Sequence, residues 1–104
     1  MARRIIWTKD AKSTLHETLS YYRTRNGNSK YSRKLYDAFK KDLLLVAQSP
    51  TIGGKTEKEN IRYIIPHPDY MLFYQYDGKK VEVLVLWDCR QDPQKLKSYF
   101  IKTK

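Results

Sequence analysis

The chain has 104 residues, of which 40% are hydrophobic and 13% aromatic, so it is long enough for one modest core and too short for two. Its 21 lysine and arginine residues against 11 aspartate and glutamate residues give a net charge of +10, which favours nucleic acid or an acidic protein as partner. The single cysteine, Cys89, excludes an internal disulfide and a cysteine-based zinc site. We expect a single domain over residues 1–104.

No pattern for export or for crossing a membrane is evident in the sequence. The opening MARRIIWTKD lacks the apolar region of a signal peptide, and no apolar run approaches transmembrane length. Together with the lone cysteine, this predicts a cytoplasmic protein with no membrane partner. No histidine, aspartate or glutamate cluster has metal-ligand spacing, so we expect neither a metal nor a cofactor.

The first half of the sequence predicts a strand and then a helical hairpin. Arg3–Trp7 is short, β-branched and aromatic, which is typical of a strand. Thr8 supplies an N-cap for a first helix, and Gly27 a left-handed cap at its end. A second helix follows, capped by Asn28 or Ser29, and stops before Pro50. So short a connection makes the two helices antiparallel.

Residues 61–90 predict three antiparallel strands. The first is Ile61–Ile65, and the prolines at 66 and 68 predict a turn after it because proline cannot donate to a strand ladder. The other two lie within Tyr70–Trp87 and are joined by Asp77-Gly78, a strong signal for a type I′ hairpin. Before these strands, we expect Thr51–Asn60 to be a flexible connection. After them, Asp92-Pro93 begins a short helix.

Alternation along the last two strands predicts that both sheet faces are apolar. One face takes Tyr70, Leu72, Tyr74 and Tyr76, and the other takes Met71 and Phe73. On the final strand, Val81, Val83, Val85 and Trp87 share one face, while Leu84 and Leu86 share the opposite face with Glu82. Two helices cover a single face, so the C-terminal tail, a second copy or a partner chain must cover the other.

Taken in order, these features resemble the RelE/ParE superfamily of type II toxins over nearly the whole chain. The resemblance rests on the strand, the basic helical hairpin, the P-x-x-G-G loop, R-Y-I-I, D-Y-M-L-F-Y and W-D-C-R-Q-D-P. It implies a growth inhibitor, of the kind associated with plasmid stabilization, silenced by a cognate antitoxin. RelE-like members cut messenger RNA on the ribosome without a metal, whereas ParE-like members bind DNA gyrase.

The residues that the resemblance assigns to RNA cleavage are incompletely matched. Arg62 and Arg90 match basic positions of the RelE-like nucleases, but Ile64 and Met71 stand where two further basic residues are found. His67 is the candidate replacement for the missing base, since imidazole titrates near neutral pH. If the chain is an endoribonuclease, these three are its catalytic candidates. Otherwise the arginines are structural, pairing with Asp88 or Asp69, and His67 is a turn residue.

Five further residues are candidates for binding the target or RNA. Lysines of the polar loop and basic residues of the helical hairpin can meet phosphate, and a tyrosine at the start of a strand can stack on a base. They are Lys55, Lys58, Arg33, Lys34 and Tyr70.

The prediction is therefore an α+β domain of order β-α-α-β-β-β, an antiparallel sheet packed on a helical hairpin, with a short C-terminal helix. Its function is that of the toxin in a toxin–antitoxin pair. The loss of two nuclease positions and the basic helical hairpin favour a ParE-like inhibitor of DNA gyrase. The alternative is a RelE-like, ribosome-dependent endoribonuclease. A third is a basic domain without toxicity that binds nucleic acid or a protein.

Overall fold

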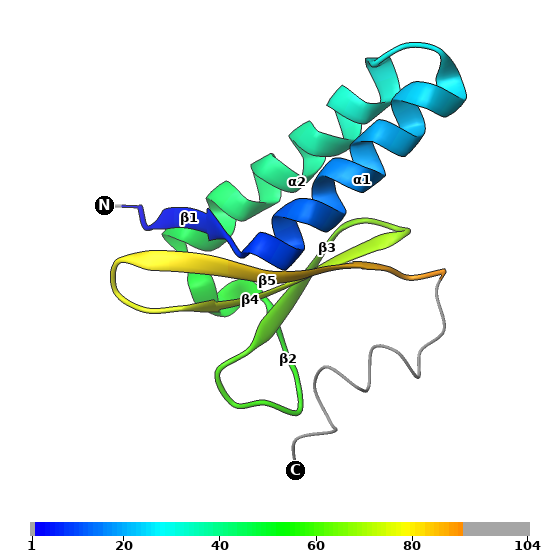
Figure 1. Ribbon diagram of the computed structural model, residues 1–104. Coiled ribbons are helices and arrows are strands. Elements are labelled where there is room, and N and C mark those ends of the chain that lie inside the picture. The colour runs from blue at the N-terminus through cyan, green and yellow to red at the C-terminus, as the bar shows by residue number, and fades with distance from the viewer. Residues whose placement is uncertain (1, 91–104) are drawn as a thin grey trace.

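The computed structural model describes residues 2–90 of the chain. In order, they form β1 (Arg4–Trp7), α1 (Lys9–Asn26), α2 (Lys30–Gln48), the 3₁₀ helix η1 (Pro50–Ile52), β2 (Gly54–Lys55), β3 (Arg62–His67), β4 (Tyr70–Tyr76) and β5 (Lys80–Asp88). The strands make one sheet in the order β1-β5-β4-β3-β2, and both helices lie on one face of it (Figure 1). This is the predicted α+β fold, with the two-residue strand β2 as an addition.

Each helix begins and ends at a residue that the sequence marks. The Thr8 hydroxyl accepts the Ala11 N–H at 3.2 Å and so caps α1, while Gly27 ends it at a φ of 70°. Ser29 occupies the N-cap position of α2 without a side-chain cap bond, and the side-chain Oδ1 of Asn28 instead accepts the Lys30 N–H at 3.0 Å. The helices therefore form the expected antiparallel hairpin.

The first and last strands lie side by side because β1 pairs with β5 in parallel. In this register Ile5 faces Val81 and Trp7 faces Val83, and the helical hairpin is part of the long connection that parallel neighbours require. The last three strands, β3, β4 and β5, are antiparallel as predicted. The β4 strand is therefore the middle of the sheet, with partners along both edges.

The main core lies between the helical hairpin and the sheet. Its members come from the two predicted helix faces and from one face of the central strands. They are Ala11, Leu15, Tyr22, Leu35, Phe39, Leu43, Tyr70, Leu72, Val83 and Leu86, all buried. A neighbouring cluster of Val46, Ala47, Tyr74 and Val81 extends this core towards the C-terminal end of α2.

A bulge in β5 shows that one prediction was wrong: Val81, Val83, Val85 and Trp87 do not all lie on one face of the sheet. Phe73 pairs with Val85 but Tyr74 pairs with Val83, so Leu84 is an extra residue. Val83 consequently packs in the core under the helices, whereas Val85 packs with Phe73 on the other face. Strict alternation was the wrong assumption, because one inserted residue moves every later side chain to the opposite face.

The hairpin between β4 and β5 is present, but its turn differs from the predicted one. The Asp77 carboxylate accepts the N–H groups of Lys79 and Lys80 at 2.7 and 2.9 Å, and the Asp77 N–H donates to the Lys80 carbonyl at 3.0 Å. Within residues 2–90 only Gly27 has a positive φ, so Gly78 is not in a type I′ conformation. The Asp77 side chain determines this turn in place of a left-handed glycine.

The β3 strand continues past its predicted end, through Pro66 to His67. Its pairing with β4 shifts between Ile64 and His67, which marks an irregularity at the proline. A proline is tolerated there because a bulge does not require every N–H to join the ladder. The turn therefore consists of Pro68 and Asp69 alone.

The segment expected to be flexible is instead tied to the sheet. The Tyr74 hydroxyl donates to the Pro50 carbonyl at 2.6 Å and accepts the Gly53 N–H at 3.2 Å. The Arg62 guanidinium adds bonds to the carbonyls of Thr51 and Gly53 at 3.2 and 2.9 Å. These side-chain bonds fix the start of the connection on the end of β4, which local sequence could not reveal.

Gly53 and Gly54 are required by close packing. A β-carbon on Gly53 would lie 2.8 Å from the Tyr63 carbonyl oxygen, and one on Gly54 would collide with the Tyr63 ring. Both contacts are closer than carbon and oxygen atoms tolerate. The glycine pair thus lets β2 approach β3, and it is explained without a phosphate ligand.

The sheet face away from the helices is apolar, as predicted. Phe73 and Trp87 form its centre, with Ile61, Tyr63, Met71 and Val85 packed beside them. Within residues 2–90, both helices lie on the opposite face (Figure 1). The predicted C-terminal helix and the tail fall in residues 91–104, outside the described part. No helix of the described residues is sufficiently long and apolar to span a bilayer.

The bonds of Tyr74 yield a stability prediction. Tyr74→Phe leaves the buried Pro50 carbonyl and Gly53 N–H without their partner, so it should lower the free energy of unfolding by about 1–3 kcal/mol. Tyr76→Phe removes a tyrosine hydroxyl two residues further along the same strand. It should change the free energy of unfolding by less than about 0.5 kcal/mol. Urea denaturation of both variants measures the difference. Equal losses would show that the Tyr74 bonds do not hold the connection.

Candidate functional site

A cluster of polar side chains lies where the helical hairpin meets the ends of three strands. It brings together one residue from α1, one from α2, and the residues at the ends of β3, β4 and β5. The members of this Arg90 cluster are Tyr22, Tyr31, His67, Tyr70, Asp88 and Arg90. Sequence analysis placed Arg90, His67 and Tyr70 among its candidates and missed the two other tyrosines.

Arg90 is held on two sides by the cluster. Its guanidinium makes a two-pronged pair with Asp88, with Nε–Oδ1 at 3.0 Å and Nη2–Oδ2 at 2.9 Å. The same Nη2 donates to the hydroxyls of Tyr22 and Tyr70, each at 3.2 Å. The Arg90 side chain is still 52% exposed. The result is a cation with a fixed orientation that remains open to a partner.

The tyrosines beneath Arg90 belong to the core as much as to the site. Tyr70 is 3% exposed and Tyr22 6% exposed, and their hydroxyls are 3.1 Å apart. Burial, followed by the Tyr22 hydrogen bond, raises the pKa of Tyr70 well above its usual range. Burial also raises the pKa of Tyr31. Both phenols therefore stay protonated near neutral pH and serve as hydrogen-bonding supports, not as bases.

His67 connects the cluster to the hairpin of β3 and β4. Its Nδ1 accepts the Asp69 N–H at 3.1 Å, and its Nε2 lies 3.2 Å from the Tyr31 hydroxyl. The Nδ1 bond places the proton of the neutral ring on Nε2, which then donates to Tyr31. Both ring nitrogens are thus engaged within the protein. That arrangement suits a structural residue at the end of β3, just before the turn, better than a base awaiting a substrate proton.

Arg62 lies away from the Arg90 cluster, at the other end of β4. It pairs across the sheet with Tyr74, whereas Asp88 pairs with Tyr70. Four residues of strand separate these positions, which is about 13 Å at the usual rise per residue. The Arg62 side chain binds carbonyl oxygens of the connection described above. The structure therefore brings His67 and Arg90 to one end of the sheet and leaves Arg62 at the other.

The residues predicted to bind the target are spread over the molecule. Arg33 and Lys34 are exposed near the start of α2, and Lys55 is exposed on β2. Lys58 is half-buried in the connection, and the Tyr70 ring is enclosed in the core. These five do not form one surface, and their role in binding stays a prediction.

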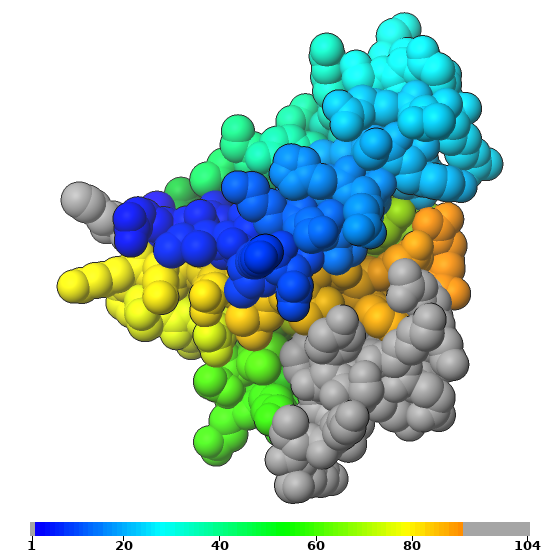
Figure 2. All heavy atoms as spheres, viewed as in Figure 1, coloured from blue at the N-terminus to red at the C-terminus, as the bar shows by residue number. Residues whose placement is uncertain are grey.

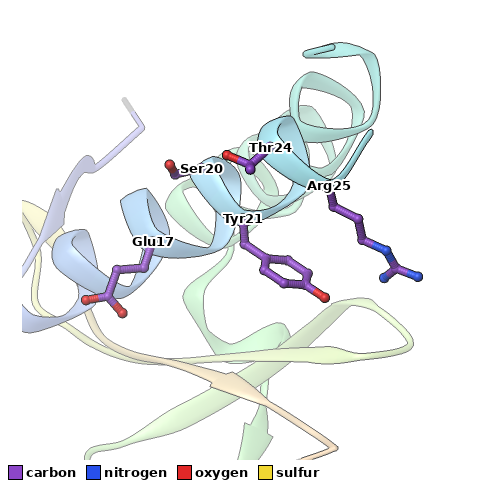
Figure 3. A pocket seen from close by; sticks show the side chains of 5 residues that line it. All are labelled: Glu17, Ser20, Tyr21, Thr24 and Arg25. Atoms are coloured by element: carbon purple, nitrogen blue, oxygen red, sulfur yellow. The ribbon is translucent and has the colours of Figure 1, made fainter. Parts of the chain in front are cut away.

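A shallow hollow runs along α1 beside the Arg90 cluster. Its first part is lined by Glu17, Ser20, Tyr21, Thr24 and Arg25, and Figure 3 shows Glu17, Tyr21 and Arg25 in succession along one side of the helix. Its second part shares Glu17 and Tyr21 and reaches Tyr70, Asp88 and Arg90. Tyr21 is 55% exposed, so an aromatic ring and two arginines face solvent along this line. Sequence analysis missed Tyr21, which the spacing of the buried Ala11, Leu15 and Tyr22 leaves off the buried face of α1.

The described residues offer no metal centre. Within residues 2–90, no three histidine, cysteine, aspartate or glutamate side chains are gathered so as to hold an ion. In the Arg90 cluster the half-exposed guanidinium is the donor that is open to a partner, while the buried Tyr22 and Tyr70 hydroxyls accept from it and the Asp88 carboxylate pairs with it. Such a set is suited to binding a carboxylate or phosphate oxygen.

Comparison with known proteins identifies relatives. The sequence model of the ParE toxin of the type II toxin–antitoxin system parDE matches residues 5–93. A solved structure described as the chromosomal ParDE TA system from P. aeruginosa superposes with a TM-score of 0.68 at 16% identity, over 84% of this chain and 96% of that one. At that identity the structural likeness concerns the fold alone. The chain matches none of the curated proteins with which it was compared.

The pair of Asp88 and Arg90 predicts a contribution to stability that depends on pH. The Arg90 hydrogen bond lowers the pKa of Asp88 below its usual 3.8 in the folded protein. A lowered folded pKa stabilises the protein above the unfolded value, and this stabilisation is lost as pH falls through the folded pKa. Since the two side chains are 24% and 52% exposed, screening limits the effect to roughly 1 kcal/mol or less.

Urea denaturation at about pH 6 and at a series of lower pH values follows this loss of stability. The wild type should lose more stability on acidification than Asp88→Asn does, and Arg90→Gln should resemble Asp88→Asn. If all three chains lose stability equally, the ion pair contributes nothing in solution.

Proposed function

Since this chain belongs to the ParE toxin family of type II toxin–antitoxin systems, we propose that it arrests growth by binding DNA gyrase and cuts no RNA itself. The family membership makes it the toxin of a pair whose other member is a cognate antitoxin. The choice of gyrase as the target is the proposal. It continues the interpretation that the sequence favours.

One observation carries the proposal: the catalytic candidates Arg62, His67 and Arg90 are not gathered around a reacting group. Cleavage by a 2′-hydroxyl attack needs a base, a cation at the phosphate and an acid for the leaving group within reach of one another. Arg90 is a cation held in place by Asp88, Tyr22 and Tyr70, and the adjoining Asp88 carboxylate is itself engaged by the Arg90 guanidinium and backbone N–H. Binding needs only the oriented, exposed guanidinium.

The positions of Arg62 and His67 support the same view. Arg62 lies about four strand residues from the cluster and is engaged with the carbonyls of Thr51 and Gly53. The lone pair of His67 Nδ1 is taken by the Asp69 N–H. A RelE-like nuclease built on these residues would have to break both arrangements before it could act.

A separate groove is suited to the antitoxin. It lies between α2 and β3 and includes the exposed side chains of Leu45, Ile52 and Ile65, which are 50%, 56% and 57% exposed. In the described chain β2 pairs only with Arg62 and Tyr63, so the rest of β3 has a free edge there. An apolar groove beside a free strand edge fits a segment of a protein that is always produced with the toxin. The antitoxin is that protein for this family.

Induction of the chain in cells tests the target. Gyrase inhibition should give a DNA-damage response and filamentation first, and purified toxin should inhibit supercoiling by gyrase in a dose-dependent manner. Co-expression of the antitoxin should abolish both effects. Early codon-positioned cuts in messenger RNA, with supercoiling unaffected, would overturn the proposal in favour of the endoribonuclease.

Replacement of Arg90 tests whether the cluster contacts the target. Arg90→Ala should abolish growth arrest while the melting temperature changes little, because an exposed ion pair contributes about 1 kcal/mol or less. Arg62→Ala is the comparison: it removes bonds to two backbone carbonyls, so it should lower the melting temperature more than Arg90→Ala does. If Arg90→Ala unfolds the domain, or stays toxic, Arg90 does not bind the target.

A further inference from the structure

The tip of the helical hairpin carries a concentration of positive charge that the proposed function does not use. Residues 18–36 contain Arg23, Arg25, Lys30, Arg33 and Lys34 and no aspartate or glutamate. All five basic side chains are exposed. None of them forms an ion pair with a carboxylate in the part of the chain that the structure describes, where Arg90 and Asp88 make such a pair. We call these five side chains the basic tip.

The basic tip stands clear of the rest of the molecule. Figure 1 shows the hairpin extending beyond the sheet, and Figure 2 shows the same cyan segment as a protruding knob. A surface of this shape meets a large partner before the body of the domain does. Positive charge at such a position also attracts a polyanion from a distance.

The local electrostatics of α2 do not favour this composition for folding alone. The positive end of a helix dipole is stabilised by acidic residues and a side-chain cap, yet α2 has no acidic residue in its first turn and no cap bond from Ser29. Lys30 and Arg33 add like charge at that end. The Asn28 side chain partly compensates by accepting the Lys30 N–H, and Arg23 and Arg25 complement the dipole at the end of α1, so Lys30 and Arg33 are the tip residues that oppose their local structure.

The side chains of the tip indicate which polyanion it meets. From Arg23 to Lys30 the sequence reads Arg-Thr-Arg-Asn-Gly-Asn-Ser-Lys. Every residue of this stretch except the glycine has a side chain that can donate a hydrogen bond. Protein interfaces are anchored by aromatic and aliphatic side chains. Between Arg23 and Lys34 no large hydrophobic side chain is exposed; the exposed ones of the described residues lie outside this span, at Tyr21, Tyr36, Leu44, Leu45, Ile52 and Ile65. Arginine, lysine, asparagine, serine and threonine are the residues that contact phosphate and sugar.

We propose that the basic tip binds the phosphate backbone of duplex DNA without sequence preference, as a second contact surface that adjoins the Arg90 cluster through the hollow along α1. The proposed affinity for phosphate follows from the charge and the hydrogen-bond donors of the tip. The choice of DNA over RNA rests on the proposed function, because an enzyme that supercoils DNA holds a duplex beside any inhibitor bound to it. The tip thereby lets the toxin engage the DNA as well as the enzyme.

Salt-dependent binding tests the proposal directly. Fluorescence anisotropy of the full-length toxin with a short labelled DNA duplex, between about 50 and 200 mM NaCl, gives a slope of about −0.9 per phosphate contact. The triple variant Arg25→Gln, Lys30→Gln, Arg33→Gln should flatten the slope by about 2.7. Glutamine keeps a helix propensity close to that of lysine and arginine, and a thermal melt confirms that the variant is folded.

A matched variant separates the tip from net charge. Lys12→Gln, Lys40→Gln, Lys41→Gln removes the same three charges from exposed positions of the two helices away from the tip. It should leave the slope close to that of the wild type. Equal weakening of both variants, or no weakening of the tip variant, overturns the proposal.

Two further ligands decide the chemistry. An RNA duplex of the same sequence should bind no more tightly than DNA, and polyglutamate should not compete at equal charge. Tighter binding of RNA overturns the assignment to DNA, and competition by polyglutamate replaces it with an acidic protein surface. Gyrase inhibition in the absence of DNA binding would overturn the tip's role and leave the proposed target intact.

Discussion

The burial of the middle strand under the helical hairpin is the constraint on which the rest of the structure depends. Tyr70, Leu72 and Tyr74 alternate along β4 and are all inaccessible beneath α1 and α2. A buried tyrosine needs a partner for its hydroxyl, because an unpaired polar group in the core is costly. The Tyr74 hydroxyl donates a hydrogen bond to the Pro50 carbonyl, after the end of α2. The Tyr70 hydroxyl forms hydrogen bonds with Tyr22 and Arg90. The β4 strand thus holds both the connection after α2, through Tyr74, and the candidate site, through Tyr70.

The site inherits its rigidity from this core. Arg90 follows the last strand, yet its guanidinium is oriented by Asp88 on β5 and by two phenols that are packed in place. A cation with a fixed orientation loses little side-chain entropy on meeting an acidic or phosphate group, which favours tight binding. The same contacts keep the surrounding groups protonated or engaged. The arrangement of Arg90 and its neighbours therefore suits the binding of a partner better than the transfer of a proton.

The molecule also separates its surfaces by chemistry. Apolar side chains are exposed in the groove between α2 and β3, the oriented cation lies just past the end of β5, and unpaired basic side chains gather at the hairpin tip. Each is suited to a different partner, because apolar grooves, oriented guanidinium groups and clustered charge bind by different interactions. A toxin that is silenced by an antitoxin and also acts on a target has use for more than one such surface.

The sequence alone determined the element order, the helix ends and the superfamily, since caps, apolar spacing and motif order are local signals. It also indicated Arg90, whose spacing from Asp88 allows the pair that the structure contains. What it could not determine depends on contacts between distant segments. The bulge at Leu84 follows from the joint packing of two strands, and the fixed connection follows from a bond of Tyr74 to Pro50, 24 residues away. The separation of Arg62 from Arg90 was decided in the same way. Two residues on different strands come together or stay apart according to register, and only the packed sheet sets the register.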